Sequence, residues 1–256
     1  MNAREIEKFR RLLGWYSRSW REAHGAVLLD TMLEHAELEK RNTPTGGERL
    51  AAVTHGLASR LDSRFALRGA ITALVCHAAA GAGWIGAMAS GSGSAVMASF
   101  IGVSAGLAFA LLSVVAMMRL RGLLSDLRSI IAGVLVISAS ALGLLTIWSW
   151  TLGFDESDAG IAPSGFARLF VPLGLAAWIF GAVAVALIVH ISRTRAHPIL
   201  HALLTGVISV VAAPLIGLTI VTPMAGAALA FGVAVIAART TRGARQGAAI
   251  PRSNRR

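Results

Sequence analysis

Beyond Arg64 the chain consists of long apolar runs separated by short polar breaks, and this pattern restricts it to very few folds. A membrane-spanning helix needs about 20 consecutive apolar residues. Single runs of that length lie at about 67–89, 95–118, 130–152 and 169–191. A fifth stretch, 199–238, contains 40 residues without a charge, which is about twice one span. The pattern therefore predicts six transmembrane helices.

The uncharged stretch 199–238 should contain a tight turn between the last two spans. We place this turn within 217–223, because the pair Thr222-Pro223 favours an extended residue followed by a new helix start. The composition agrees with membrane insertion. Only 14% of the residues are charged, against about a quarter in soluble domains, and the mean hydropathy is +0.66. No secretory signal precedes the first run, so the first span is expected to remain as an uncleaved anchor.

The basic residues predict the orientation. The formal net charge is +11, but the arginines lie in short breaks between apolar runs, which argues against nucleic-acid binding. If the breaks alternate between the two sides, 23 of the 24 Lys and Arg residues fall on one side and only Arg168 on the other. The positive-inside rule makes the basic side cytoplasmic. We therefore expect a multi-pass plasma-membrane protein whose N-terminus and C-terminus are both cytoplasmic.

The first 64 residues are rich in charged side chains, and their pattern predicts three short helices. Each helix is predicted to begin with a capping pair, in which a residue with a side-chain oxygen is followed three positions later by a Glu. The pairs are Asn2 with Glu5, Ser19 with Glu22, and Thr45 with Glu48. Gly14 is expected to end the first helix, and the second should run to about Lys40. An apolar stripe follows each pair, so the three helices can cover one another.

These observations predict an all-α, polytopic membrane protein. A small cytoplasmic three-helix segment, residues 1–64, precedes a six-helix transmembrane domain, residues 65–239. A basic cytoplasmic tail, residues 240–256, follows. The lipid bilayer is the first expected partner.

No catalytic, cofactor-binding or metal-binding motif is found, so we predict a protein that is not an enzyme and needs no cofactor. No Asp, Glu, Lys or Arg lies at the middle of any predicted span, which argues against a proton-coupled or cation-coupled transporter. His77 is the one ionisable residue well inside a span. We interpret it as a neutral side chain bonded to a neighbouring helix rather than as a proton relay. His190, His197 and His201 have no accompanying carboxylate or thiolate, so we interpret them as interfacial rather than metal-binding.

Small residues are frequent in the predicted spans. Gly102 and Gly106 form a GxxxG pattern, and Gly81, Gly83 and Gly86 line the outer half of the first span. Because small residues let helix backbones approach closely, both sets are expected to be helix-packing faces.

The most distinctive segment is 11–21, RLLGWYSRSWR, which is followed by His24-Gly25. It resembles the opening of a family of uncharacterised bacterial multi-pass membrane proteins, commonest in high-GC Gram-positive bacteria. Their helical cytoplasmic prefix shows the pattern WYP-x-x-WR-x-x-x-G, and this chain has Ser17 at the position of the proline. The layout also resembles the helical signalling domains associated with PadR-like transcription regulators and the prefix domains of some permeases. The resemblance covers about the first 60 residues and brings no established activity.

Two functions fit this layout. The first is a regulatory or sensory membrane protein whose prefix binds a cytoplasmic partner such as a transcription regulator. Trp15, Tyr16 and Trp20 are the candidate partner-binding residues, because tryptophan is enriched at binding hot spots. These aromatics could instead form the core of the prefix or lie at the membrane interface. The second function is a permease subunit of an exporter, which would need a separate ATPase.

Overall fold

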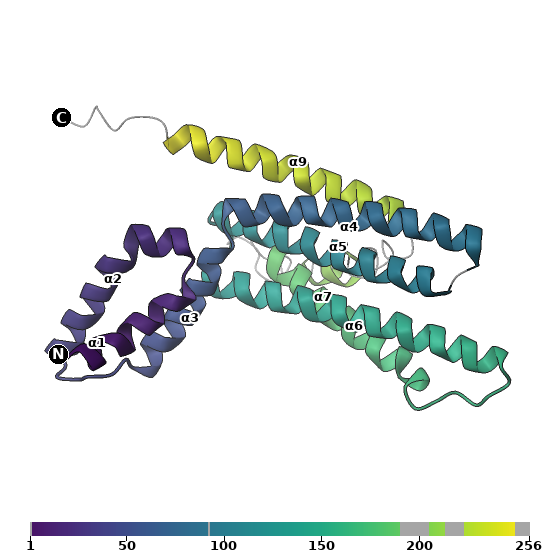
Figure 1. Cartoon of the computed structure of the whole chain (residues 1–256), viewed down its shortest axis with the longest axis horizontal. Coiled ribbons are helices and arrows are strands. Elements are labelled where there is room, and N and C mark those ends of the chain that lie inside the picture. Colours follow the sequence, from purple (N-terminus) through teal and green to yellow (C-terminus); the bar gives the residue numbers. More distant parts are fainter. Residues whose placement is uncertain (1, 92, 190–204, 213–222, 249–256) are drawn as a thin grey trace.

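The computed structural model describes residues 2–91, 93–189, 205–212 and 223–248, and every regular element within them is a helix. We call residues 1–64 the prefix and the helices that follow the bundle. The prefix lies at one end of the bundle (Figure 1). Its elements are α1 (Ala3–Arg10), the 3-10 helix η1 (Arg11–Trp15), α2 (Arg18–Leu38) and α3 (Gly46–Arg60).

Two of the three predicted capping pairs are confirmed and one is wrong. Asn2 with Glu5 and Thr45 with Glu48 both form complete capping boxes. At the start of α2, however, the side chain of Ser17 rather than Ser19 accepts the hydrogen bond from the backbone N–H of Trp20.

The first helical segment also differs from the prediction that Gly14 ends it. The α-helix ends at Arg10, and the chain continues as the tighter 3-10 helix η1, in which Gly14 is included. At the end of the prefix, Asp62 caps α4 by accepting a hydrogen bond from the N–H of Phe65 at 2.7 Å. The prefix is thus joined to the bundle by a two-residue corner.

Four helices among the described residues are long and apolar enough to cross a membrane. They are α4 (Ser63–Ser90), α5 (Gly93–Leu120), α6 (Asp126–Asp158) and α7 (Phe170–Val189), with the short 3-10 helix η2 (Ala167–Leu169) preceding α7. α6 has 33 residues, about 50 Å of helix, so it exceeds the hydrocarbon thickness of about 30 Å. The acidic segment 155–158, which lies between the predicted spans 130–152 and 169–191, forms the last turn of α6.

α4 and α5 pack closely in antiparallel directions, and the glycines of α5 make this possible. A Cβ atom on Gly102 would lie 3.0 Å from the Cβ of Ala80, and one on Gly106 would lie 2.8 Å from Cδ2 of His77. The GxxxG is thus a packing face, as predicted. The prediction for the α4 glycines is wrong in part. Gly83 faces Ser99 of α5, but Gly81 and Gly86 have nothing within 4 Å among the described residues.

α9 (Pro223–Ala248) lies along the other side of α4 (Figure 1). Its contacts with α4 run in opposite order along the two chains, so the helices are antiparallel: Val233 and Ala237 pack near Ala66 and Ala70, and Ala230 near Ala73. α6 and α7 are antiparallel as well, since Gly174 faces Thr146 and Gly153 faces Ala167. α4 and α6 therefore begin at the end near the prefix, and α5, α7 and α9 run toward it.

Several sequence predictions fall outside the described residues. These are the histidines at 190, 197 and 201, the arginines at 193 and 195, and the turn region up to residue 222. Residues 205–212 are helical. α9 begins at Pro223, as the Thr222-Pro223 pair predicts, and its helix extends to Ala248, into the segment that we assigned to the tail.

Candidate functional site

The three aromatic residues singled out in the sequence lie together, but they differ in exposure. Tyr16 is 7% exposed and belongs to the core of the prefix with Phe9, Leu12 and Leu13. The ring of Trp20 stacks on that of Tyr16, with 4.1 Å between the centroids. Trp15 is 42% exposed and is the one of the three that offers a substantial surface to a partner. Burial, followed by the negative charge of Asp126, raises the pKa of Tyr16 above its ordinary value.

The outer surface of the prefix carries exposed apolar side chains away from the aromatic cluster. Val27 and Leu38 of α2 are 70% and 76% exposed, and Leu50 of α3 is exposed to a similar extent. Val27 and Leu38 are eleven residues apart, which is about three helical turns, so they lie on the same face of α2. They are about 16 Å apart along the helix, with Thr31 and Glu34 between them, so they are separate exposed apolar residues rather than one continuous patch.

A charged network ties the prefix to the bundle. Nδ1 of His55 in α3 lies 2.7 Å from Oδ2 of Asp126, the first residue of α6. The other oxygen of Asp126 accepts a hydrogen bond from Nε of Arg119, near the end of α5, also at 2.7 Å. Arg119 in turn donates through Nη1 to the backbone oxygen of Leu61, at the end of α3. Asp126 thus links α3, α5 and α6 through side-chain contacts.

Within the prefix, η1 is held tightly against α3. Arg60 donates hydrogen bonds to the carbonyl oxygens of Trp15, at 3.1 Å, and Gly14, at 3.3 Å. Gly56 of α3 lies so close to Trp15 that a Cβ atom at this position would be 2.8 Å from the backbone carbonyl carbon of Trp15. Ser59 accepts a hydrogen bond from the backbone N–H of Ser17 at 3.0 Å. These contacts fix the start of α2 relative to α3.

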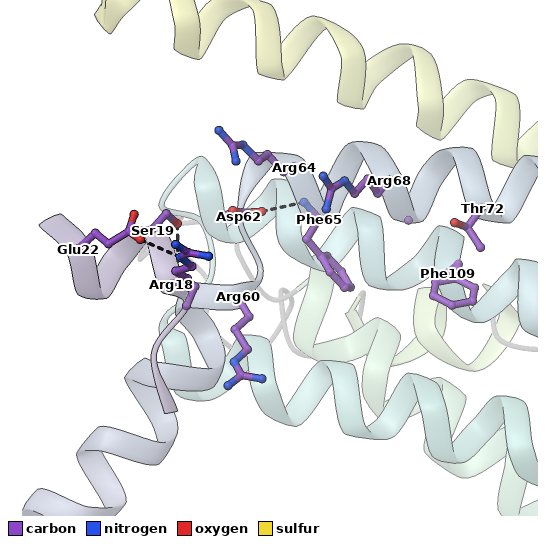
Figure 2. Close-up of a pocket in the computed structure, with 12 residues that line it drawn as sticks. Arg18, Ser19, Glu22, Arg60, Asp62, Arg64, Phe65, Arg68, Thr72 and Phe109 are labelled. Carbon is purple, nitrogen blue, oxygen red and sulfur yellow. Dashed lines mark hydrogen bonds and ion pairs between the residues drawn. The ribbon is translucent and has the colours of Figure 1, made fainter. Parts of the chain in front are cut away.

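A cleft of about 600 Å³ lies where the start of α2 meets the α3–α4 corner (Figure 2). It is lined at one end by charged side chains and at the other by residues of the bundle. Four of the lining side chains are the arginines 18, 60, 64 and 68, and two are the carboxylates Glu22 and Asp62. Its floor includes Phe65, Thr72 and Phe109. The cleft therefore changes from basic to largely apolar along its length.

Most of the charged groups in the cleft already have partners. Glu22 accepts from Arg18 at 2.8 Å, and Asp62 caps α4. Arg60 extends away from the other arginines, toward the carbonyl groups of η1 (Figure 2). Arg64 and Arg68, one turn apart on α4, are exposed and have no acceptor among the described residues. Both carboxylates are thus engaged, whereas two guanidinium groups remain available to an anion.

Among the described residues of the bundle, the most buried ionisable side chain is that of His77, which is 1% exposed. Its ring lies between Gly106 of α5 and Gly226 of α9. Both ring nitrogens lack a hydrogen-bond partner among the described residues. The prediction that His77 bonds to a neighbouring helix is therefore wrong for this part of the chain. The physical reason is that the residues that face the ring are glycines, which bring no polar side chain.

The described residues contain no group of three or more His, Cys, Asp or Glu side chains placed to hold a metal ion. What the junction can do is bind an anion in the cleft and transmit movement through Asp126. Sequence reasoning missed both features. The residues that meet at Asp126 and around the cleft lie far apart in sequence, so no local pattern brings them together.

Comparison of the chain with protein-family models, with curated proteins and with solved structures finds no match.

Proposed function

We propose that this is a six-span plasma-membrane protein with both termini in the cytoplasm, and that it has a regulatory or sensory role. In this proposal the prefix, residues 1–64, binds a cytoplasmic protein partner, and the bundle controls how it is presented. The resemblance of segment 11–21 to prefixes of bacterial multi-pass membrane proteins agrees with this role.

Two features of the bundle support the six-span count and the orientation. α7 and α9 run in the same direction, so the chain between them has to return to the far end, which favours one further crossing. The described helix ends near the prefix carry arginines, among them Arg64, Arg119 and Arg128. Basic helix ends are retained on the cytoplasmic side of a membrane.

The observation that carries the regulatory role is the link from His55 through Asp126 to Arg119. It ties α3 to two membrane helices, so a rearrangement of the bundle alters the position of the prefix. Regulation requires two sites joined by an element that both can bias. The exposed face with Val27 and Leu38 supplies the surface on which a partner is expected.

Cysteine labelling tests the topology. Cys76 is the only cysteine, so Cys76→Ser gives a background without thiols. In that background, Ser157→Cys should react with a membrane-impermeant maleimide applied to intact cells, whereas Arg49→Cys in α3 should react only after lysis. Labelling of Arg49→Cys in intact cells would overturn the proposed orientation.

Photo-crosslinking in cells tests the partner. A photoreactive residue at Leu38 should give one discrete crosslinked protein, whereas the same residue at Ile161, which is exposed at the opposite end of the bundle, should not. A crosslinked transcription regulator supports the proposal, and Asp126→Asn should then change the yield of this product at unchanged protein level. A crosslinked ATPase would favour the permease subunit instead. No product at Leu38, Val27 or Trp15 would refute partner binding.

A further inference from the structure

We infer that the arginine cleft at the start of α4 binds the phosphate-bearing headgroup of an anionic phospholipid. The inference requires α4 to lie in a membrane, but it does not require a protein partner. It rests on three properties of the cleft: free guanidinium groups, a depth that reaches past the headgroup layer, and an apolar floor.

The first property is the unbalanced positive charge. Arg64 and Arg68 are neighbours on one face of α4, since they are four residues apart. The carboxylates beside them, Glu22 and Asp62, are engaged by Arg18 and by the N–H of Phe65. A phosphodiester presents oxygens that guanidinium groups bind well, often through two hydrogen bonds at once. The free pair on α4 therefore selects an anion, with phosphate as the best match.

The second property is depth. The cleft extends along α4 from Arg64 to Thr72, which is eight residues and therefore about 12 Å of helix. The headgroup layer on each side of a bilayer is only about 5–7 Å thick. If Arg64 lies at the level of the phosphates, the far end of the cleft lies in the hydrocarbon. A soluble phosphate ion would use only the outer end.

The third property is the floor. Phe65, which lies between the two arginines in sequence, and Phe109 both line the cleft, and Figure 2 shows Phe109 beside Thr72, beyond the two arginines. An acyl chain descending from a bound headgroup would cover these side chains. Beyond Arg68 the lining consists of Gly69, Thr72 and Phe109, so the charged part of the cleft is followed by an uncharged part, as a headgroup is followed by an acyl chain. Basic pockets beside transmembrane helices on the cytoplasmic side are known to bind anionic lipid headgroups.

The test is lipid binding by the full-length protein, purified in a neutral detergent and freed of endogenous lipid. Binding of phosphatidylglycerol is compared with binding of phosphatidylcholine by native mass spectrometry. The test variant is Arg64→Gln/Arg68→Gln. The matched control is Arg49→Gln/Arg121→Gln, which removes the same charge at two exposed positions outside the cleft.

We expect the wild type to bind phosphatidylglycerol at least tenfold more tightly than phosphatidylcholine. The cleft variant should lose about 25-fold in affinity, about fivefold for each arginine, and the control variant less than threefold. Equal losses in the two variants would show attraction by net charge alone and would overturn the site. Displacement of the lipid by millimolar inorganic phosphate would assign the cleft to a soluble anion and would overturn the lipid. Because no partner is present, the result does not depend on the proposed regulatory role.

Discussion

Substitution of Gly226 by alanine should destabilise the bundle, because the added methyl group would enter the space of the His77 ring. An ideal Cβ at Gly226 lies 2.6 Å from Nδ1 of His77 and also overlaps Cε1. Gly106 of α5 lies against the opposite edge of the ring, so closely that even a Cβ atom placed there would be 2.9 Å from Nε2, and this leaves the ring little room to move aside. α9 must therefore shift away from α4.

Overpacking of this kind costs about 1–3 kcal/mol. For a chain of this size we expect the midpoint of thermal unfolding in detergent to fall by about 2–12 °C. Gly232→Ala is the matched control on the same helix, since nothing lies within 4 Å of its added methyl group among the described residues. That control should be neutral or gain up to about 1 kcal/mol from helix propensity.

A double-mutant cycle identifies His77 as the cause. His77→Ala removes the obstructing ring, so Gly226→Ala should cost at least about 1 kcal/mol less in the His77→Ala background than in the wild type. The midpoint of thermal unfolding is measured for all four proteins. If Gly226→Ala unfolds at the same temperature as Gly232→Ala, or if its effect is the same in both backgrounds, the proposed packing of α9 on His77 is incorrect.

Two further predictions concern the prefix. Gly56→Ala should loosen α3 from η1, since its methyl group would meet backbone atoms of Trp15 that cannot rotate away. The rate of amide hydrogen exchange in residues 46–60 should rise at least tenfold. The control Gly47→Ala, whose methyl group meets no backbone, should leave this rate unchanged. The hydrogen bonds from Arg41 hold the pKa of Glu48 below its usual 4.5, so this carboxylate stabilises the prefix above that pH and the contribution is lost as pH falls through the lower folded value. Protection of α3, corrected for intrinsic exchange, should therefore fall below pH 4.5 in the wild type and change less in Glu48→Gln; equal pH profiles would contradict this.

The parts of the fold that depend on local sequence could be predicted. The spans at 67–89, 95–118, 130–152 and 169–191 each correspond to a long helix, because apolar length alone decides whether a segment suits a membrane. The capping boxes at Asn2 and Thr45 were also predictable, because both hydrogen bonds of each box join residues within one four-residue segment.

The errors arise where a distant contact decides between local alternatives. Ser17 and Ser19 both lie where a capping residue of α2 is expected, and residue type cannot decide between them because both are serine. The backbone N–H of Ser17 is held by Ser59, 42 residues away, and this contact accompanies the choice of Ser17 as the cap. No local pattern contains that information.

The candidate site was less accessible to prediction than the fold. The three aromatic residues could be selected by residue type within segment 11–21. The burial of Tyr16, however, depends on the packing of η1 against the rest of the prefix. The roles of Asp126 and of Arg64 appear only when α3 and the start of α2 are brought to the ends of α4, α5 and α6. The surroundings of His77 likewise come from two other helices.

The contact of α9 with α4 has a consequence for how the protein is made. Gly226 follows His77 by 149 residues, so at about 5–20 residues per second the ribosome needs about 7–30 s to synthesise the helix that covers this histidine. During that interval the edge of the imidazole that later faces Gly226 is not covered by α9. The contact that covers this face of α4 thus comes from a segment translated 149 residues later. A chain truncated before α9 would keep this polar side chain uncovered, a feature by which quality-control proteases could distinguish incomplete molecules from finished ones.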